Sequence, residues 1–285
     1  MQVIGEERRD GARVLDLTYD DGSGGRVSAF VVAPGIQTDP QPVRSGPAGG
    51  GPGIVWAHWF DSEHPNADRT EFLPDAVALA VKGVTSVLPQ GAFPWASDPT
   101  DSTTDRAKIE AEVLRLRRGL DLLLAGIDAG PAPGAVIEPG AVGSMVRPAD
   151  PTRLAMVGHD FGGMAVAVAV ARDRRPVATV ILAATPRWGD WFLPFWPIAE
   201  DRLAYLAGLR PVDPIEWVGR IAPASVLFQA ARQDFYIAPM ASHELHRAAG
   251  EPRDLRWYDA AHDLDLPDAR ADRQAFLEER LRPLR

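Results

Sequence analysis

The sequence predicts an α/β fold, in which a mainly parallel sheet carries helices on both faces. From Ile54 to the C-terminus, short apolar runs alternate with segments of helical pattern, as in parallel strands joined by crossover helices. The chain has 285 residues, of which 46% are hydrophobic, so it can bury a large core without disulfides. This length fits one large domain or two small ones, and we expect a single domain over residues 1–285.

A β-hairpin is the first predicted element. Arg13–Tyr19 and Arg26–Val32 are β-like runs, and the turn-forming residues Asp20–Gly25 separate them. A segment rich in Pro and Gly follows, from Gly35 to Gly53. Its glycines 49–51 are followed by neither Gly-Lys-Ser/Thr nor a helix, so we expect a flexible loop rather than a phosphate-binding loop.

Strands and helices then alternate to the end of the chain. Apolar runs predict strands at Ile54–Ala57, Val84–Leu88, Leu154–Val157, Val177–Ala184, Ser225–Ala230 and Leu255–Tyr258. Helical patterns predict helices at Asp68–Lys82, Thr103–Ala125, Gly163–Arg172 and Asp268–Arg282.

Two segments interrupt this alternation. Gly126–Asp150 is rich in Gly, Pro and Ala, which predicts a surface loop excursion. Thr185–Pro223 holds four of the eight tryptophans of the chain, which predicts a short aromatic lid over a pocket. The alternative is that these rings only attach two short helices to the sheet. Pro194 and Pro197 interrupt the segment and favour the lid.

Composition excludes several classes of function. The net charge of −9 argues against a general binder of nucleic-acid phosphates. Cysteine is absent, which excludes a thiolate nucleophile and a Cys-based metal site. The polar start, Met1 to Arg13, shows no signal peptide, and no apolar run reaches the ~20 residues that cross a bilayer. We expect a soluble cytoplasmic protein with a small-molecule substrate and neither a nucleic-acid nor a membrane partner; its oligomeric state stays open, with a homodimer among the alternatives.

The strongest motif is Gly158-His159-Asp160-Phe161-Gly162-Gly163, which joins an apolar strand to an Ala/Val-rich helix. This context is typical of a nucleophile elbow, a tight turn that raises one side chain above the sheet edge. Glycines flank the central residue because the strained backbone brings neighbouring chains too close for a Cβ atom. A helix N-cap would explain Asp160 alone, but it does not require the three glycines.

Two later residues complete a catalytic set. Asp234 follows the strand at 225–230, and His262 follows the last strand. With Asp160, they lie after strands at one edge of a parallel sheet, where such sheets bind ligands. Asp234 alone could be a turn residue and His262 a surface histidine. Their order, nucleophile, acid and then His, predicts a triad of Asp160, Asp234 and His262.

Residues 54 to 280 resemble the α/β-hydrolase superfamily, with the layout of dienelactone hydrolases. The resemblance rests on Ile54-Val-Trp-Ala-His58, the elbow, the strand end at Asp234 and the Ala-Ala-His262 loop. The elbow is also similar to those of epoxide hydrolases and haloalkane dehalogenases, whose nucleophile is Asp. The resemblance implies the α/β-hydrolase fold without metal or organic cofactor. It further implies that Asp160 attacks, His262 activates water and Asp234 orients His262. The backbone N–H groups of Phe161 and of Trp59 or Phe60 would form the oxyanion hole.

The sequence departs from these families at several positions. His58-Trp59 stands where many hydrolases have His-Gly, and Phe161 replaces the halide-binding Trp that dehalogenases commonly have. Epoxide hydrolases use lid tyrosines as proton donors, whereas this lid offers only Tyr205, with Tyr236 a second candidate near Asp234. Dienelactone hydrolases normally carry Cys or Ser at the nucleophile.

The chemistry of a carboxylate narrows the substrate class. Its attack on saturated carbon gives a stable ester that activated water then opens, whereas attack on an ordinary ester gives a mixed anhydride. Asp160 therefore favours a bulky apolar epoxide, ahead of a carbon–halogen compound. The dienelactone-hydrolase-like order of elements is also compatible with a carboxylic ester or lactone as substrate. A third alternative is a non-catalytic protein whose pocket only binds its ligand.

Further residues are candidates for the pocket. We expect substrate contacts from His58, His159, Trp188, Trp191, Trp196, Tyr205 and Tyr236. Asp61, Glu63 and His64 could line the mouth of the pocket. His243 and His246 form no H-E-x-x-H pattern, so we expect a surface helix and no metal site there.

Overall fold

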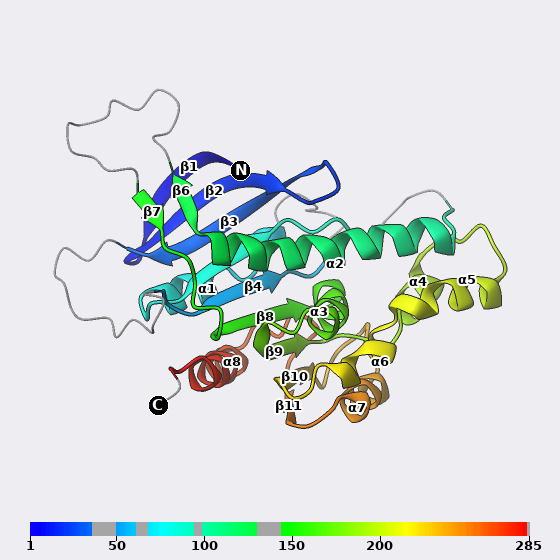
Figure 1. Cartoon of the computed structure of the whole chain (residues 1–285). Helices are drawn as coiled ribbons and strands as arrows, with labels where there is room; N and C mark the ends of the chain where they lie inside the picture. The colour runs from blue at the N-terminus through cyan, green and yellow to red at the C-terminus, as the bar shows by residue number, and fades with distance from the viewer. Residues whose placement is uncertain (36–49, 61–67, 94–98, 130–143, 284–285) are drawn as a thin grey trace.

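The computed structural model describes residues 1–35, 50–60, 68–93, 99–129 and 144–283 (Figure 1). A nine-stranded sheet with the order β1-β2-β3-β5-β4-β8-β9-β10-β11 forms its centre. The first three strands are antiparallel, and those from β5 to β11 along the sheet are parallel. The bounds are β1 Gln2–Arg9, β2 Ala12–Asp20, β3 Arg26–Pro34, β4 Gly53–Ala57, β5 Thr85–Pro89, β8 Leu154–His159, β9 Pro176–Leu182, β10 Ser225–Ala231 and β11 Arg253–Tyr258.

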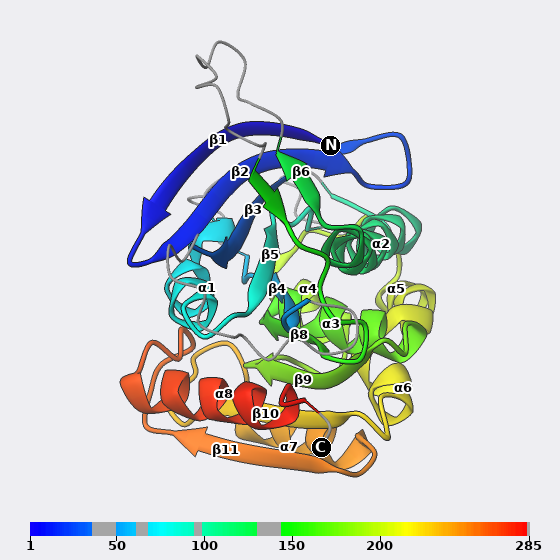
Figure 2. The same ribbon diagram turned by 60° about the vertical axis from the view of Figure 1, so that its left-hand side comes forward.

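Helices cover both faces of this sheet, as the sequence predicts (Figure 2). The helices α1 (Leu73–Ala80) and α8 (Pro267–Arg280) pack in one apolar cluster. The other cluster contains α2 (Ser102–Ala125) and α3 (Phe161–Arg172), and α7 (Pro239–Ala248) contacts β10 and β11. Every residue of α3 except Arg172 is buried, so the helix that follows Asp160 is firmly held.

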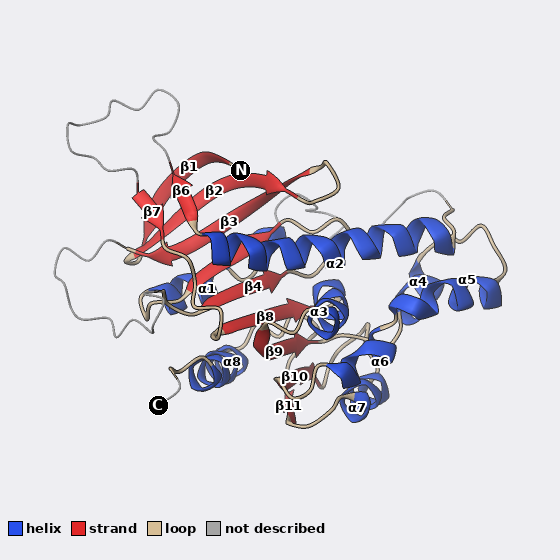
Figure 3. Ribbon diagram, viewed as in Figure 1, coloured by secondary structure: helices blue, strands red, loops and turns tan. Residues whose placement is uncertain are grey.

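Short helices occupy the segment between β9 and β10, the predicted lid (Figure 3). They are α4 (Trp188–Phe195), α5 (Arg202–Leu209), η2 (Arg210–Val212), α6 (Pro214–Trp217) and η3 (Val218–Arg220). Pro194 lies inside α4 and Asp201 caps α5 by accepting the N–H groups of Leu203 and Ala204. We keep the name lid segment for residues 185–223.

The position of the site follows from the order of the strands. The chain leaves β4 for the neighbouring β5, and it later returns to the other side of β4 as β8. The helices after β4 and β8, α1 and α3, pack in opposite apolar clusters. At such a switch point the carboxyl ends of two adjacent strands open a crevice that binds ligands. Asp160 follows β8 and therefore lies at this switch point.

The N-terminal strand β1 was not predicted. The hairpin at 13–32 is confirmed as β2 and β3, but β1 pairs with β2 at the outer edge of the sheet. Most residues of β1 are exposed, including four charged residues at its end. Charged side chains on an edge strand prevent it from pairing with another chain. A strand with such a charged surface lacks the alternation of apolar and polar residues by which strands are predicted.

Two other predictions were only partly right. The predicted helix Asp68–Lys82 is a short 3-10 helix, η1 (Asp68–Thr70), followed by α1 from Leu73. Pro74, in the first turn of α1, favours this later start. The predicted loop 126–150 contains two strands, β6 (Ile127–Ala129) and β7 (Ser144–Val146), which pair antiparallel.

Among the described residues, no helix is long and apolar enough to cross a membrane.

Candidate active site

Asp160 occupies the strained turn that the sequence predicts between β8 and α3. Its φ of 53° and ψ of −119° are unusual for a residue other than glycine. Its side chain makes no N-cap hydrogen bond, so the alternative of a simple helix N-cap is wrong. A Cβ atom at position 158 would collide with the backbone oxygen of Gly162. At position 162 it would collide with the backbone oxygens of Ala57 and His58. The glycines allow β4, β8 and α3 to meet beneath Asp160.

Replacing Gly162 by alanine tests this close approach. We expect Gly162→Ala to lower the free energy of unfolding by about 1–3 kcal/mol, because the overpacked backbone must move. Thermal unfolding measures the change, and Gly5→Ala is the control because nothing lies within 4 Å of a Cβ atom there. Equal stability of the two variants would contradict the packing argument.

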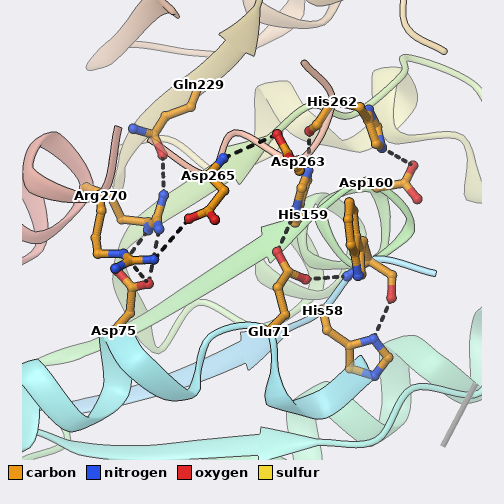
Figure 4. Close-up of polar contacts among 12 residues, drawn as sticks. His58, Glu71, Asp75, His159, Asp160, Gln229, His262, Asp263, Asp265 and Arg270 are labelled. Atoms are coloured by element: carbon orange, nitrogen blue, oxygen red, sulfur yellow. Dashed lines mark hydrogen bonds and ion pairs between the residues drawn. The ribbon is translucent and has the colours of Figure 1, made fainter. Parts of the chain in front are cut away.

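His262 and Asp234 form a hydrogen-bonded pair, and the His262 ring lies beside the Asp160 carboxylate (Figure 4). The Nδ1 atom of His262 lies 2.9 Å from Oδ2 of Asp234, and Oδ1 of Asp234 accepts the backbone N–H groups of Tyr236 and Ile237. Burial raises the pKa of Asp234, but the hydrogen bond and charge of His262 outweigh it, and the pKa is lowered. An ionised Asp234 accepts a hydrogen from Nδ1, so Nε2 of a neutral His262 keeps its lone pair. That Nε2 lies 3.9 Å from Oδ1 of Asp160.

The carboxyl group of Asp160 is buried, and hydrogen bonds and charges around it offset only part of the cost of burying its ionised form. Burial raises its pKa to about 7, against the lowering effects of His262 and of hydrogen bonds from the backbone N–H groups of Phe161 and Phe60. Oδ1 has no hydrogen-bond partner. The N–H of Trp59 instead donates to Oε2 of Glu71 at 2.7 Å. Of the two alternatives for the oxyanion hole, the geometry therefore favours Phe60, together with Phe161, over Trp59.

The two histidines beside the triad are held by hydrogen bonds. Nδ1 of His58 donates to the carbonyl oxygen of Trp59, and Nε2 accepts the backbone N–H of Gly91 at 2.7 Å. Burial lowers the pKa of His58 to about 4, so this ring is neutral and fixes the loop after β4. His159 contacts Glu71 through Nδ1 and the carbonyl oxygen of His262 through Nε2. A contact of either ring with substrate stays a prediction.

Glu71 is the residue that the sequence analysis missed. It lies in the turn before α1, and its partners Trp59 and His159 are 12 and 88 residues away. No local pattern marks such a residue, and a lone glutamate between a 3-10 helix and an α-helix is ordinary.

Part of the lid segment lies directly against the triad. The ring of Trp191 stacks on Tyr236 at 5.1 Å and meets His262 edge-on at 5.9 Å. Trp196 contacts Phe161 and Phe60 at 6.0 and 6.1 Å. The indole N–H groups of Trp191 and Trp196 are buried without a hydrogen-bond partner. These rings form an apolar wall beside the triad; that they act as a lid over a pocket stays a prediction.

Two other aromatic residues of the lid segment anchor it instead. Nε1 of Trp188 donates to the carbonyl oxygen of Val212 at 2.9 Å, and the hydroxyl of Tyr205 donates to Asp105 of α2 at 2.5 Å. Both rings are fully buried. A substrate contact by either residue would require these bonds to break, so the geometry gives them a packing role. Tyr236, whose ring lies 5.1 Å from that of His262 and is about half exposed, is the better placed tyrosine.

The remaining candidates do not add to this site. Asp61, Glu63 and His64 lie outside the described residues. His243 and His246 lie on α7, where their rings pack on Trp257 and Phe228. Within the described ranges, no group of three or more His, Asp or Glu residues could hold a metal ion.

Comparisons with known proteins agree with this architecture. No protein-family model and no curated protein matches the chain. Among solved structures, an acetyl xylan esterase from Paenibacillus sp. R4 is 18% identical with a TM-score of 0.69, covering 98% of this chain and 88% of its own. A cold-adapted esterase from an Arctic intertidal metagenomic library is 13% identical with a TM-score of 0.63, covering 99% and 100%. The α/β hydrolase GrgF from Penicillium sp. sh18 is 13% identical with a TM-score of 0.60, covering 93% and 98%. The chain has the α/β-hydrolase fold.

Proposed function

We propose that this protein is a hydrolase that uses Asp160 as its nucleophile and acts on a bulky apolar substrate, an epoxide ahead of a carbon–halogen compound. The observation that carries the proposal is the placement of the Asp160 carboxylate. It stands on the elbow with Oδ1 unpaired, while Nε2 of His262 lies 3.9 Å away, beyond hydrogen-bond distance. A serine nucleophile must pass its proton to the base, whereas a carboxylate has no proton to lose, so the base is free to act on water.

The chemistry takes two steps. A carboxylate oxygen of Asp160 attacks the substrate carbon, and the bond from that carbon to the epoxide oxygen or the halide breaks. The epoxide oxygen takes up a proton, for which Tyr236 is the best placed donor. Nε2 of His262 then removes a proton from water, which attacks the ester carbon of Asp160. The N–H groups of Phe60 and Phe161 stabilise the oxyanion. When the tetrahedral intermediate collapses, the ester C–O bond breaks, the alcohol keeps one proton of the water and Asp160 is regenerated as a carboxylate. The imidazolium, which Asp234 stabilises, returns its proton to the Tyr236 phenolate in the epoxide reaction and to solvent in the halide reaction.

The aromatic wall supports an apolar substrate. Trp191, Trp196 and Tyr236 surround the proposed nucleophile and base with ring faces and edges, and apolar surface buried against such rings contributes most of the binding energy in small-molecule sites. The two unpartnered indole N–H groups supply donors beside these rings. They suit a substrate that carries a hydrogen-bond acceptor, such as an epoxide oxygen or a halogen.

Hydrolysis of a carboxylic ester or lactone is the second candidate. Two of the solved structures with this fold are named as esterases. Attack by Asp160 on an ester carbonyl would give an anhydride, so this alternative needs a good leaving group. It predicts faster turnover of aryl esters than of any epoxide.

The test is to trap the covalent intermediate. His262→Ala lacks the base that activates water, so it should accumulate an ester on Asp160 when incubated with an aryl epoxide or a bromoalkane. Intact-protein mass spectrometry should show a gain of the whole epoxide, or of the alkyl group without its halide. The control is the double variant Asp160→Asn/His262→Ala, which should show no gain. An adduct of equal yield in the control, or none in either variant while aryl esters turn over in the wild type, would refute an alkyl-ester mechanism.

A further inference from the structure

The pair Glu71–His159 links the two loops that carry the proposed oxyanion donor and base (Figure 4). His159 ends β8, and its ring is fully buried. Its Nδ1 lies 2.6 Å from Oε1 of Glu71, and its Nε2 lies 2.9 Å from the carbonyl oxygen of His262. The other oxygen of Glu71, Oε2, accepts the N–H of Trp59 at 2.7 Å. One carboxyl group and one imidazole thus connect the loop after β4, the turn before α1 and the loop after β11.

The atoms around His159 determine how many hydrogens the pair must hold. The carbonyl oxygen of His262 can only accept, so Nε2 of His159 must carry a hydrogen. Nδ1 faces a carboxyl oxygen, and a neutral imidazole has no second hydrogen to place there. A neutral ring beside an ionised Glu71 would set a lone pair against a negative oxygen at 2.6 Å. One additional proton between the two groups is therefore required, and the short distance is typical of a charge-assisted hydrogen bond.

The surroundings of the ring favour placing that proton on His159. The indole of Trp59 stacks on the imidazole with ring centroids 5.3 Å apart and planes inclined by 22°. An aromatic face attracts a cation. Oε2 of Glu71 already accepts the N–H of Trp59, and an N–H donor stabilises a carboxylate more than a neutral carboxylic acid.

We propose that Glu71 and His159 form a carboxylate–imidazolium pair that positions the oxyanion loop and the His262 loop relative to each other. Trp59, held by Glu71, precedes Phe60, whose N–H reaches Asp160. The backbone of His262, held by His159, belongs to the proposed base. Neither member of the pair takes part in bond making. Their positioning role rests on the proposed function, whereas the protonation state of the pair does not.

Nuclear magnetic resonance of protein labelled with ¹⁵N in its histidines tests the protonation state directly. At neutral pH, the signals of His159, assigned by their loss in His159→Gln, should show two protonated ring nitrogens. Glu71→Gln offers Nδ1 an amide N–H in place of the carboxylate, so the same ring should become neutral with its hydrogen on Nε2. A neutral His159 in the folded wild type would overturn the proposal, whether or not any hydrolase activity is found.

The positioning role has its own measurement and a matched control. We expect Glu71→Ala, which removes the hydrogen bonds to both Trp59 and His159, to lower kcat/KM by about 10–100-fold, the size of effect that outer partners of a site have, mainly through kcat. Asp75→Asn is the control, because Asp75 is a buried carboxylate of α1, four residues from Glu71, that pairs with Arg273 of α8. It should lower the melting temperature without changing kcat/KM of the folded protein or the His159 signals. Unchanged kcat/KM in folded Glu71→Ala would overturn the positioning role, while absence of turnover in the wild type would refute only the proposed function.

Discussion

Replacing Asp160 by asparagine is expected to reduce turnover by about 10⁴-fold or more, the loss seen when a covalent nucleophile is removed from a hydrolase. Asparagine fits the same space but offers a neutral amide instead of a carboxylate. The N–H donors of Phe60 and Phe161 and the His262–Asp234 pair should stay in place. The measurement is kcat/KM on the best epoxide, bromoalkane or aryl ester, with a mass check that excludes deamidation back to aspartate.

An oxygen-isotope experiment separates Asp160 as nucleophile from direct attack of water on the substrate. In water enriched in the heavy isotope, the first turnover should release a product whose new oxygen comes from the Asp160 carboxylate and is therefore light. After many turnovers, the peptide containing Asp160 should carry the heavy isotope. Asp234→Asn should label the same peptide more slowly, because His262 loses its orienting acceptor. Heavy oxygen in the product of the first turnover, with an unlabelled peptide, would show that Asp160 does not attack.

The elbow was predictable from the sequence because the information that specifies it is local. Gly158, Gly162 and Gly163 surround Asp160 within six residues, and each glycine is needed at a backbone contact or at close packing. Asp234 and His262 were found from their positions just after strands, since parallel strands bring their carboxyl ends to one edge. Their hydrogen bond of 2.9 Å follows from that common edge.

The features that were missed depend on contacts between distant segments. Tyr205 is an aromatic residue of the lid segment and was therefore expected to face the substrate. Its hydroxyl instead donates a hydrogen bond to Asp105, which lies 100 residues away in the sequence. Which face of a short helix turns inward is decided by such partners rather than by the residue itself. Glu71 and His159 are joined over 88 residues, and β1 has an exposed, charged surface without apolar alternation. Residue type and local spacing contain no signal for any of these.

The difference in stability between Asp160→Asn and the wild type should depend strongly on pH. Burial raises the pKa of Asp160 to about 7, whereas an unfolded aspartate has a pKa of about 4. Between these two values the folded protein binds the proton more tightly than the unfolded chain, so this group makes wild-type stability fall as pH rises from about 4 to about 7. The difference of about three pKa units corresponds to a free energy of unfolding on the order of 4 kcal/mol. Asparagine does not titrate, so the variant should gain by this amount relative to the wild type between pH 4 and pH 8.

Asp234→Asn is the matched control, because its expected change has the opposite sign. The pKa of Asp234 is lowered in the folded protein, where the interactions with His262 outweigh burial. Its ionisation therefore stabilises the fold above the pKa of the unfolded aspartate, and this contribution is lost as pH falls through the folded value. Urea unfolding should show Asp160→Asn gaining stability relative to the wild type between pH 4 and pH 8. Asp234→Asn should be less stable than the wild type at both of these pH values, and its deficit should shrink only below about pH 4. If both variants followed the wild type at both pH values, Asp160 would not be held as a desolvated carboxylate. Burial that destabilises the ionised carboxylate of Asp160 also leaves it poorly solvated, and a poorly solvated carboxylate is a stronger nucleophile. Without that burial effect, this reason for the reactivity of Asp160 would be lost.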